Sequence, residues 1–242
     1  MKYYTIQPSP RLAPYVRCFW VFEGEASDAE PYIYRGYADG CTEIVFHYQS
    51  PFDQLVGDVV QTAHAAGIHA HTRKFTRFVV GRSFGIFGCY LYPYALPKLL
   101  SLPASDFTDH MVDLDDVLGR DGSELEERML VAATNEGRVA ILSAFLEKRL
   151  TAVRTAEPLV FASIRKIIDE RGLVNVRSLA REHFFSDRQF ERKFKEFSGF
   201  SPKLYSRINR FQAALKQYGS GKSLTCIAYD CGYYDQSHFI ND

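Results

Sequence analysis

The sequence predicts an α+β protein of two domains. The N-terminal domain, residues 1–156, is expected to form an antiparallel β-sandwich or small barrel with packed helices, and the C-terminal domain, residues 157–242, to be all-α. Short β-prone runs broken by Gly, Pro and Asp-Gly turns fill the chain as far as Tyr92, whereas nearly everything after Pro158 follows the 3.6-residue period of helices. A chain of 242 residues is long enough to bury two modest cores.

The N-terminal domain changes character within its own length. Its clearest strands are predicted at Tyr15–Phe22, Glu43–Tyr48 and Ile86–Tyr92. These runs are rich in β-branched and aromatic residues, which favour strands. From Pro93 onward the apolar residues recur at helical spacing instead. Helices are predicted around Leu96–Leu100 and at 113–118, 123–133 and 138–151. Residues 1–92 are therefore expected to be β-rich and residues 93–152 to be helices packed beside the sheet.

The predicted boundary between the domains lies at Thr155–Pro158, because proline can end one helix and begin the next. Downstream helices are predicted at 158–171, 176–183, 187–198, 202–218 and 224–231, with a last one beginning near Gln236. Glycine, which commonly ends helices, follows several of these segments directly. The helix at 202–218 would join two units of similar pattern.

The segment 175–197 has the pattern of a helix-turn-helix, in which a short helix braces a second helix that enters the major groove of DNA. Asn175 can cap the first helix and Ser186 the second. The buried faces are expected to consist of Val176, Leu179 and Ala180 in the first helix and of Phe190, Phe194 and Phe197 in the second. The spacing of the three phenylalanines at i, i+4 and i+7 places them on one face.

The opposite face of the second helix carries side chains that suit base recognition, since Arg pairs with guanine, Gln with adenine, and Glu accepts from cytosine. The outward side chains are Asp187, Arg188, Gln189, Glu191, Arg192, Lys193 and Lys195. Residues 177–222 carry 11 Lys and Arg against 4 Asp and Glu, whereas residues 1–156 carry 15 against 19. A solvated amphipathic helix gives the same local pattern, but a concentrated positive charge favours double-stranded DNA as a partner.

A second unit of the same pattern follows about 48 residues later, with Ile227-Ala228 at the position that corresponds to Leu179-Ala180. Ser223 can cap its first helix, Gly232 can supply a turn with positive φ, and Asp235 can cap the next helix. That helix would present Gln236, Ser237, Ile240 and Asn241. A linker helix of about 16 residues, or about 24 Å, could place the two units in successive major grooves.

These residues resemble the AraC/XylS family of transcription regulators over about residues 175–242. The matching positions are Leu179-Ala180, Ser186, Phe190, Arg192 and Phe194, then FKEFSGFSPKLY with Gly199, Ser201, Pro202 and Tyr205, Arg207 or Arg210, and IAYDCGYYDQSHF. The resemblance implies a two-headed DNA-binding domain. It implies base contacts at Arg188, Glu191 and Arg192 in the first head and at Gln236, Ser237, Ile240 and Asn241 in the second. Lys203 is expected near a phosphate.

The sequence departs from the family pattern at three places. Phe184 occupies the first turn, where the family usually has a small or polar residue, which predicts local strain or a shifted turn. Cys226 stands where the family often has Glu, which removes a capping box. Family members continue beyond the position of Asp242, so the second head is expected to be truncated at its C-terminus.

The first 120 residues resemble, more weakly, the sensor module of some of these regulators through LAPYVRCFW, YADGCTEIVFHY and VDLDDVLG. This resemblance implies a cupin-like barrel, an unknown small-molecule effector, a homodimer and contact with RNA polymerase. Ligand contacts are expected at Trp20, Tyr34 and Glu43, the last a polar group on an apolar strand. Other aromatic residues could line the same pocket, although aromatics in a β-domain more often form its core: Tyr15, Phe19, Phe22, Tyr32 and Tyr37.

Three histidines raise the alternative of a metal-dependent cupin-type enzyme. They are His64, His69 and His71. Two His one residue apart on a strand point the same way, as metal ligands require. However, residues 72–88 contain no Asp or Glu, so a polar loop or dry edge strand is favoured and no metal or cofactor is expected.

No enzyme is predicted, because the chain contains no recognisable triad, phosphate loop or close carboxylate pair. Cys18, Cys41 and Cys89 are too scattered for the zinc site of a DNA-repair alkyltransferase, and all five cysteines are expected to be buried thiols. A further alternative is a partner protein that has lost DNA binding and acts through mixed dimers. Without an apolar run of 18 residues or a secretory signal, the protein is expected in the cytoplasm and away from membranes.

Overall fold

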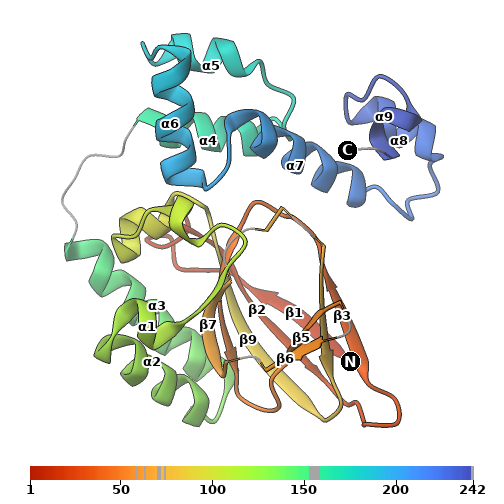
Figure 1. The fold of residues 1–242 in the computed structure, drawn as a ribbon. Coiled ribbons are helices and arrows are strands. Elements are labelled where there is room, and N and C mark those ends of the chain that lie inside the picture. Colours follow the sequence, from red (N-terminus) through yellow and green to blue (C-terminus); the bar gives the residue numbers. More distant parts are fainter. Residues whose placement is uncertain (58, 63, 70–71, 74, 153–158, 241–242) are drawn as a thin grey trace.

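A computed structural model describes the chain except for residues 58, 63, 70–71, 74, 153–158 and 241–242. Two antiparallel sheets and their helices form the N-terminal part, and a separate layer of helices lies above them (Figure 1). The predicted α+β architecture is therefore confirmed. The predicted boundary at Thr155–Pro158 lies outside the described residues.

The larger sheet has six strands in the order β1-β2-β9-β4-β7-β10. Their bounds are Lys2–Ile6 for β1, Val16–Gly24 for β2, Phe84–Leu91 for β9, Thr42–His47 for β4, Ala66–His69 for β7 and Met111–Asp113 for β10. The smaller sheet has the order β3-β8-β5-β6. Its strands span Tyr32–Gly36 for β3, Thr76–Val80 for β8, Asp53–Val56 for β5 and Val59–Gln61 for β6. The strands expected at Tyr15–Phe22, Glu43–Tyr48 and Ile86–Tyr92 correspond to β2, β4 and β9.

The two faces of the larger sheet bury different side chains. Along β4, Ile44 and Phe46 belong to the main core, whereas Glu43, Val45 and His47 face a cavity on the other side. Successive side chains of a strand point to opposite faces, so this alternation follows directly from the sequence. One face thus anchors helices, and the other faces the smaller sheet.

The two edge strands of the larger sheet are among those that were not predicted individually. The first is β1, which lies in the segment 1–92 that was expected to be β-rich and pairs with β2 from Lys2–Glu23 to Ile6–Phe19. The other is β10, a three-residue strand inside the segment 93–152 that was expected to be helical, and it pairs with β7. Such a short strand has too few residues to show a period, and only its pairing partner defines it.

Helices cover the outer face of the larger sheet. They are a π-helical turn η1 at Leu96–Leu100, a 3-10 turn η2 at Ala104–Phe107, α1 at Leu114–Leu118, α2 at Arg120–Val131 and α3 at Asn135–Ala152. The helices predicted around Leu96–Leu100 and at 113–118, 123–133 and 138–151 are all found, within a few residues. Buried leucines and a methionine from these helices join Phe19 and Phe87 of the sheet in one core.

The C-terminal helices follow the predicted order. Their bounds are Leu159–Asp169 for α4, Val176–Glu182 for α5, Asp187–Ser198 for α6, Pro202–Leu215 for α7, Leu224–Asp230 for α8 and Gln236–Ile240 for α9. The linker helix α7 has 14 residues, slightly fewer than expected. Within the described ranges, no helix combines the length and the apolar character needed to span a membrane.

The hydrophobic core continues from the larger sheet into the C-terminal helices. Phe161 of α4, Phe194 of α6 and Tyr205 of α7 belong to the same buried cluster as Phe19 and Leu96. The units α5–α6 and α8–α9 differ in this respect. A separate small cluster holds α8 and α9 to the end of α7, and its buried members are Ala214, Ile227, Ala228, Cys231 and Tyr233.

Candidate nucleic-acid interface and ligand cavity

Side-chain caps fix both helices of the first helix-turn-helix unit, α5 and α6. The Oδ1 of Asn175 accepts hydrogen bonds from the backbone N–H groups of Arg177 and Ser178, at 3.0 and 3.2 Å. Ser186 and Gln189 form a capping box, in which Ser186 N donates to Gln189 Oε1 at 3.2 Å. The predicted caps are therefore confirmed. The amide of Gln189, predicted to meet a base, is engaged at the helix start.

The two faces of α6 separate apolar from charged side chains as the spacing predicts. Phe190 and Phe194 are buried with ring centroids 5.6 Å apart, and Phe197 is half-buried. The predicted readers Arg188, Glu191, Arg192 and Lys195 are all exposed. None of these four takes part in an ion pair with a described residue. Arg188, Arg192 and Lys195 lie at i, i+4 and i+7 and so form one basic face on the helix.

The turn between α5 and α6 carries the strain that Phe184 predicts. Phe184 has φ +57°, in the left-handed region that non-glycine residues rarely adopt, and its side chain is 95% exposed. The turn closes through Phe185 N, which donates to Ala180 O at 3.0 Å. Bulk at this position is accommodated because the side chain projects into solvent.

The second unit, α8 and α9, repeats this arrangement with different residues. Ser223 caps α8 by accepting from Cys226 N at 3.2 Å, and Asp235 accepts from His238 N at 2.7 Å. Gly232 takes the turn position with φ +72°. These three predictions are confirmed.

The predicted contact residues of the second unit are partly accessible. Ser237 and Ile240 are exposed, whereas Gln236 is half-buried and accepts a hydrogen bond from Thr225 Oγ1 at 2.9 Å. Asn241 lies outside the described residues. Lys203, expected near a phosphate, is exposed at the start of α7.

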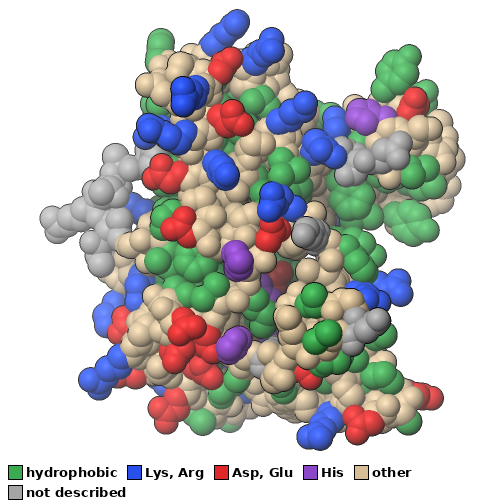
Figure 2. Space-filling model, in the orientation of Figure 1, with side chains coloured by type: hydrophobic (Ala, Val, Ile, Leu, Met, Phe, Trp, Pro, Cys, Tyr) green, Lys and Arg blue, Asp and Glu red, His purple; other side chains and the backbone are tan. Residues whose placement is uncertain are grey.

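Basic side chains gather on the helical layer. Figure 2 shows Lys and Arg side chains spread over its upper part, where Figure 1 places α5 and α6, while Asp and Glu side chains cluster lower down on the N-terminal part. This distribution agrees with the 11 Lys and Arg against 4 Asp and Glu counted in residues 177–222. A surface of this kind attracts polyanions.

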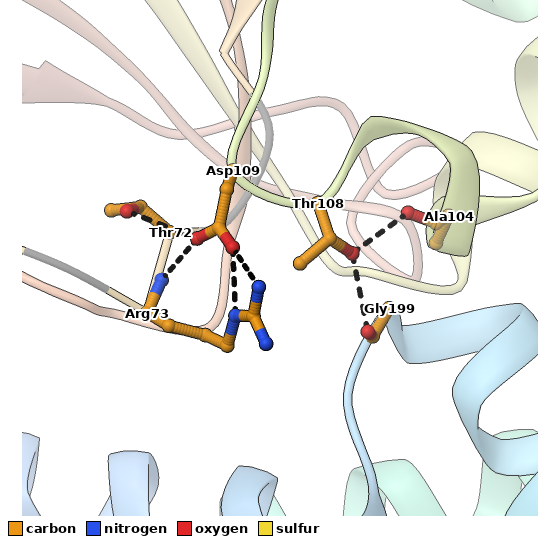
Figure 3. A network of polar contacts seen from close by, with 6 residues as sticks. All are labelled: Thr72, Arg73, Ala104, Thr108, Asp109 and Gly199. Carbon is orange, nitrogen blue, oxygen red and sulfur yellow. Dashed lines mark hydrogen bonds and ion pairs between the residues drawn. The ribbon is translucent and has the colours of Figure 1, made fainter.

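A polar contact joins the end of α6 to the N-terminal part (Figure 3). The hydroxyl of Thr108 lies 3.1 Å from Gly199 O and 3.5 Å from Ala104 O, so its one hydrogen can be donated to Gly199, the C-cap of α6. The neighbouring Asp109 accepts from Arg73 N at 2.8 Å and from Arg73 Nε at 2.7 Å. The segment that follows β7 is thereby linked to the end of the predicted recognition helix.

A second junction connects the loop before β4 to α7. Gln212 Nε2 donates to Ala38 O at 2.6 Å. Gly40, with φ +69°, packs so closely against Tyr205 that a Cβ there would lie 2.9 Å from its ring. No local pattern of residues predicted either junction, since the partners are far apart along the chain.

A cavity of about 320 Å³ lies between the two sheets. It is lined mostly by aromatic side chains: Tyr3, Trp20, Phe22, Tyr32, Tyr34, Glu43, Val45, His47, Phe52, His69, Phe78, Ile86 and Tyr90. All three residues predicted to contact a ligand, Trp20, Tyr34 and Glu43, are among them. Gly88 faces Trp20 across the β2–β9 pair, and a Cβ there would lie 2.1 Å from the indole, so this glycine makes room for the tryptophan wall.

The remaining aromatic residues divide between core, cavity and surface. Tyr15 and Phe19 belong to the core, as the general preference suggested. Phe22 and Tyr32 line the cavity, which the sequence left open. Tyr37 is exposed.

Glu43 is the acidic group of the cavity. It lies between Tyr90 of β9 and His69 of β7 in the sheet register. Burial, and then the charge of Asp39, raise the pKa of Glu43 to about 8, against a hydrogen bond with Tyr90 that lowers it. The side chain of Glu43 is half-buried and lines the cavity.

Two histidines of the cavity are neutral. Burial lowers the pKa of His47 to about 4 and that of His69 to about 3. Both ring nitrogens of His47, Nε2 of His69 and Nε1 of Trp20 are buried without a hydrogen-bond partner among the described residues. Buried polar groups normally have partners, so these atoms mark polar positions that a ligand could satisfy.

The histidine prediction needs correction. His69 lies neither in a polar loop nor on an edge strand, because β7 is flanked by β4 and β10. His64 Nδ1 lies 2.5 Å from Asp113 Oδ2, and His71 lies outside the described residues. In the part of the chain that the structure describes, no three His, Cys, Asp or Glu side chains gather as a metal site would require.

The prediction for the cysteines is also partly wrong. Cys18, Cys41, Cys89 and Cys231 are buried, but Cys226 is exposed on α8. It is the third residue of α8, whose buried residues are Ile227 and Ala228.

Two family models match separate parts of the chain. A family described as a helix-turn-helix domain matches residues 179–242, and a domain of unknown function (DUF6597) matches residues 4–113. No curated protein matches the chain. Among solved structures, the chain is similar to ToxT from Vibrio cholerae, with 13% identity over 91% of each chain and a TM-score of 0.47.

Two further solved structures are also similar to the chain. ToxT from Vibrio cholerae with bound unsaturated fatty acid shows 13% identity over 90% of this chain and 87% of its own, with a TM-score of 0.45. The AraC-like transcriptional activator CuxR shows 12% identity over 92% of this chain and 97% of its own, with a TM-score of 0.32.

Proposed function

We propose that the chain is a member of the AraC/XylS family of helix-turn-helix transcription regulators and that it binds double-stranded DNA through α6 and α9 under the control of a small molecule. The observation that carries the proposal is the exposed basic face of α6, formed by Arg188, Arg192 and Lys195. A helix held from behind by buried phenylalanines can enter a major groove without rearrangement of its own core.

Four exposed side chains of α6 receive a role from their chemistry. Arg188 and Arg192 have the fork geometry that pairs with the O6 and N7 atoms of guanine, and Glu191 can accept from cytosine N4. Lys195 and Lys203 are assigned to phosphates, where they contribute affinity without sequence preference.

The second unit contributes fewer contacts. Ser237 can hydrogen-bond to a base or phosphate, and Ile240 can contact a thymine methyl group. Gln236 can reach a base only by leaving its hydrogen bond with Thr225. Asn241 keeps the role that the family resemblance implies for it.

The cavity between the sheets is the proposed effector site, with Trp20, Tyr34 and Glu43 as contacts. Two routes lead from it to the DNA-binding helices. One runs from His69 on β7 towards Arg73, Asp109 and the Thr108–Gly199 contact, and the other runs from Glu43 through the loop at Ala38 to Gln212 on α7. An effector that favours one arrangement of these contacts would shift the DNA-binding equilibrium.

The proposal extends to the rest of the molecule. Residues 1–156 are proposed as the sensor and residues 157–242 as the DNA-binding domain, in a cytoplasmic homodimer that contacts RNA polymerase. The oligomeric state of the full chain is measured by light scattering at several concentrations.

A gel-shift experiment tests DNA binding. The full chain is titrated onto the DNA upstream of its own gene at several salt concentrations, and we expect affinity to fall steeply with salt. Arg192→Ala should weaken binding, whereas Arg82→Ala, which removes an exposed arginine in the β8–β9 turn, should not. Absence of salt-dependent binding, or equal losses in both variants, would contradict the proposal.

A further inference from the structure

We propose that the cavity binds a small organic cation, an aryl- or alkylammonium ion whose charge pairs with Glu43 and whose apolar body lies between the aromatic walls. This inference rests on the proposed function, because it names the chemical class of the effector for the same cavity. It is carried by the lining residues, their charges and the polar atoms left without partners.

The walls offer aromatic faces on several sides. On the larger sheet, Trp20 lies 5.9 Å from Tyr90 and 6.4 Å from Tyr3, measured between ring centroids. On the smaller sheet, Tyr34 lies 6.3 Å from Phe78. The negative faces of such rings attract ammonium groups, and the attraction grows when the site is removed from water. An enclosure of this kind suits a cation with an apolar body.

The charges of the lining favour the same class. Among the described residues that line the cavity, Glu43 is the only acid, and none is Lys or Arg. Arg17, the nearby cation, donates to Cys41 Sγ at 3.5 Å and lines a different hollow beside α7. The two histidines add no positive charge, because burial keeps their pKa values well below neutrality. An anionic ligand would find no counter-ion among these side chains.

A cation also resolves the electrostatic cost of the buried carboxyl. Without a counter-charge, burial favours the neutral acid, whereas a cation within about 4–6 Å favours the carboxylate. The titratable groups that act on Glu43 or line the cavity with it are Asp39, Tyr90, Tyr34, Tyr3, Cys18, Cys41, Cys89, His47 and His69. None of these supplies a positive charge at neutral pH. An ammonium ion would therefore provide the partner that the protein itself does not.

The unpartnered polar atoms give the ligand further contacts. A neutral imidazole has one nitrogen that accepts, so His47 and His69 can each accept a hydrogen bond from an ammonium N–H group. Trp20 Nε1 donates and can satisfy an ether, hydroxyl or carbonyl oxygen on the same molecule.

The test uses three probes of similar shape and different charge. They are benzyltrimethylammonium, its uncharged carbon analogue neopentylbenzene, and phenylacetate. Trp20 is the single tryptophan of the chain and lines the cavity, so its fluorescence reports occupancy directly in the full-length protein. We expect benzyltrimethylammonium to bind at least about tenfold more tightly than neopentylbenzene, the difference that a desolvated cation–π and ionic contact can supply.

Variants locate the charge recognition. Glu43→Gln should remove the advantage of the cation over neopentylbenzene while leaving the binding of neopentylbenzene itself unchanged. Glu25→Gln, a matched change at an exposed position just after β2, should retain the advantage. Because the neutral probe binds in the same walls, its unchanged affinity shows that Glu43→Gln is folded. If Glu43→Gln no longer binds neopentylbenzene, a second variant, Tyr34→Leu, takes its place. This variant keeps the carboxyl and removes one aromatic face, so it must lower the affinity for the cation more than for neopentylbenzene.

Two outcomes overturn the inference. One is tighter binding of phenylacetate, or of an unsaturated fatty acid such as oleate, than of the ammonium probe. The other is an ammonium advantage that survives Glu43→Gln. A gel shift on the same preparation separates this inference from the proposed function: DNA binding without ammonium binding rejects the cation site alone, and ammonium binding without DNA binding rejects the regulator alone.

Discussion

The two helix-turn-helix units start from matching local signals but are held in place differently. Each begins with a capped short helix and a buried pair, Leu179-Ala180 or Ile227-Ala228, and each has a positive-φ turn. The first unit shares the main core, through Phe190 and other residues, with the β-sheet and its helices. The second packs on the end of α7 through a small cluster of its own.

This difference teaches that one sequence pattern can produce two degrees of coupling to the rest of a protein. The stability of a helix of seven or twelve residues comes mainly from packing, so the number of buried neighbours sets how firmly it is held. The first unit should unfold together with the N-terminal sheets, whereas the second can open by itself. If the cavity is an effector site as proposed, the shared core joins it directly to α6.

The largest expected effect is on the shared core. Phe194→Ala should destabilise the part that shares the main core by about 3–5 kcal/mol, because it removes a fully buried ring that contacts Phe190 and Tyr205. Ile227→Ala should cost about 2–4 kcal/mol, but only in α8 and α9. Hydrogen exchange measured along the chain checks this: loss of protection in β4 on Ile227→Ala would break the comparison.

A smaller effect distinguishes the two kinds of DNA contact. Arg192→Ala should weaken binding by about 1–3 kcal/mol and relax preference at one base pair, because it removes a base contact. Lys203→Ala should weaken all sequences alike and reduce the salt dependence. Binding to a set of single-base operator variants measures both. Uniform losses from Arg192→Ala would contradict its assignment as a base reader.

The pH dependence of stability links the cavity to the first unit. Glu43 has a raised pKa, so the folded state holds a proton that the unfolded state releases above about pH 4.5. Its contribution to stability is complete below that value and is lost as the pH rises through about 8. His47 and His69 have lowered pKa values and act in the acidic range instead.

We therefore expect the free energy of unfolding of the part that shares the main core to fall by about 1–2 kcal/mol between about pH 6.5 and 8.5, allowing for solvent in the cavity. In Glu43→Gln it should change little over the same range. Urea unfolding at the two pH values measures the change. Hydrogen exchange should show weaker protection of α6 at the higher pH and no change in α8. Equal pH dependence in the wild type and in Glu43→Gln would remove this link.

The smallest effect concerns the two turns. Phe184→Gly should stabilise the first turn by about 0.5 kcal/mol, since relief of the left-handed conformation outweighs the added freedom of glycine in the unfolded chain. Gly232→Ala should destabilise the second unit by about 1–2 kcal/mol, because it introduces the same strain and a Cβ 2.3 Å from Leu173 Cδ2. Thermal unfolding of both variants compares the turns, and a destabilising Phe184→Gly would mean that the exposed ring has a partner.

Local signals determined the helical third of this protein. The bounds of α6, its Ser186 cap, its buried phenylalanines and its exposed arginines all follow from residues within one or two turns of each other. The same is true of the strand alternation that turns Glu43 away from Ile44 and Phe46. Caps, turns and periodicity are short-range effects, and they survive in any fold that keeps the helix or strand.

Only the tertiary structure decided where the two sheets leave a cavity, which strands flank His69, and which core each helix-turn-helix unit joins. It also decided that Thr108 meets Gly199, 91 positions along the chain, and that Gln212 meets Ala38. These features depend on pairing and packing between distant segments, and no local pattern of residues determines the free energy of such contacts.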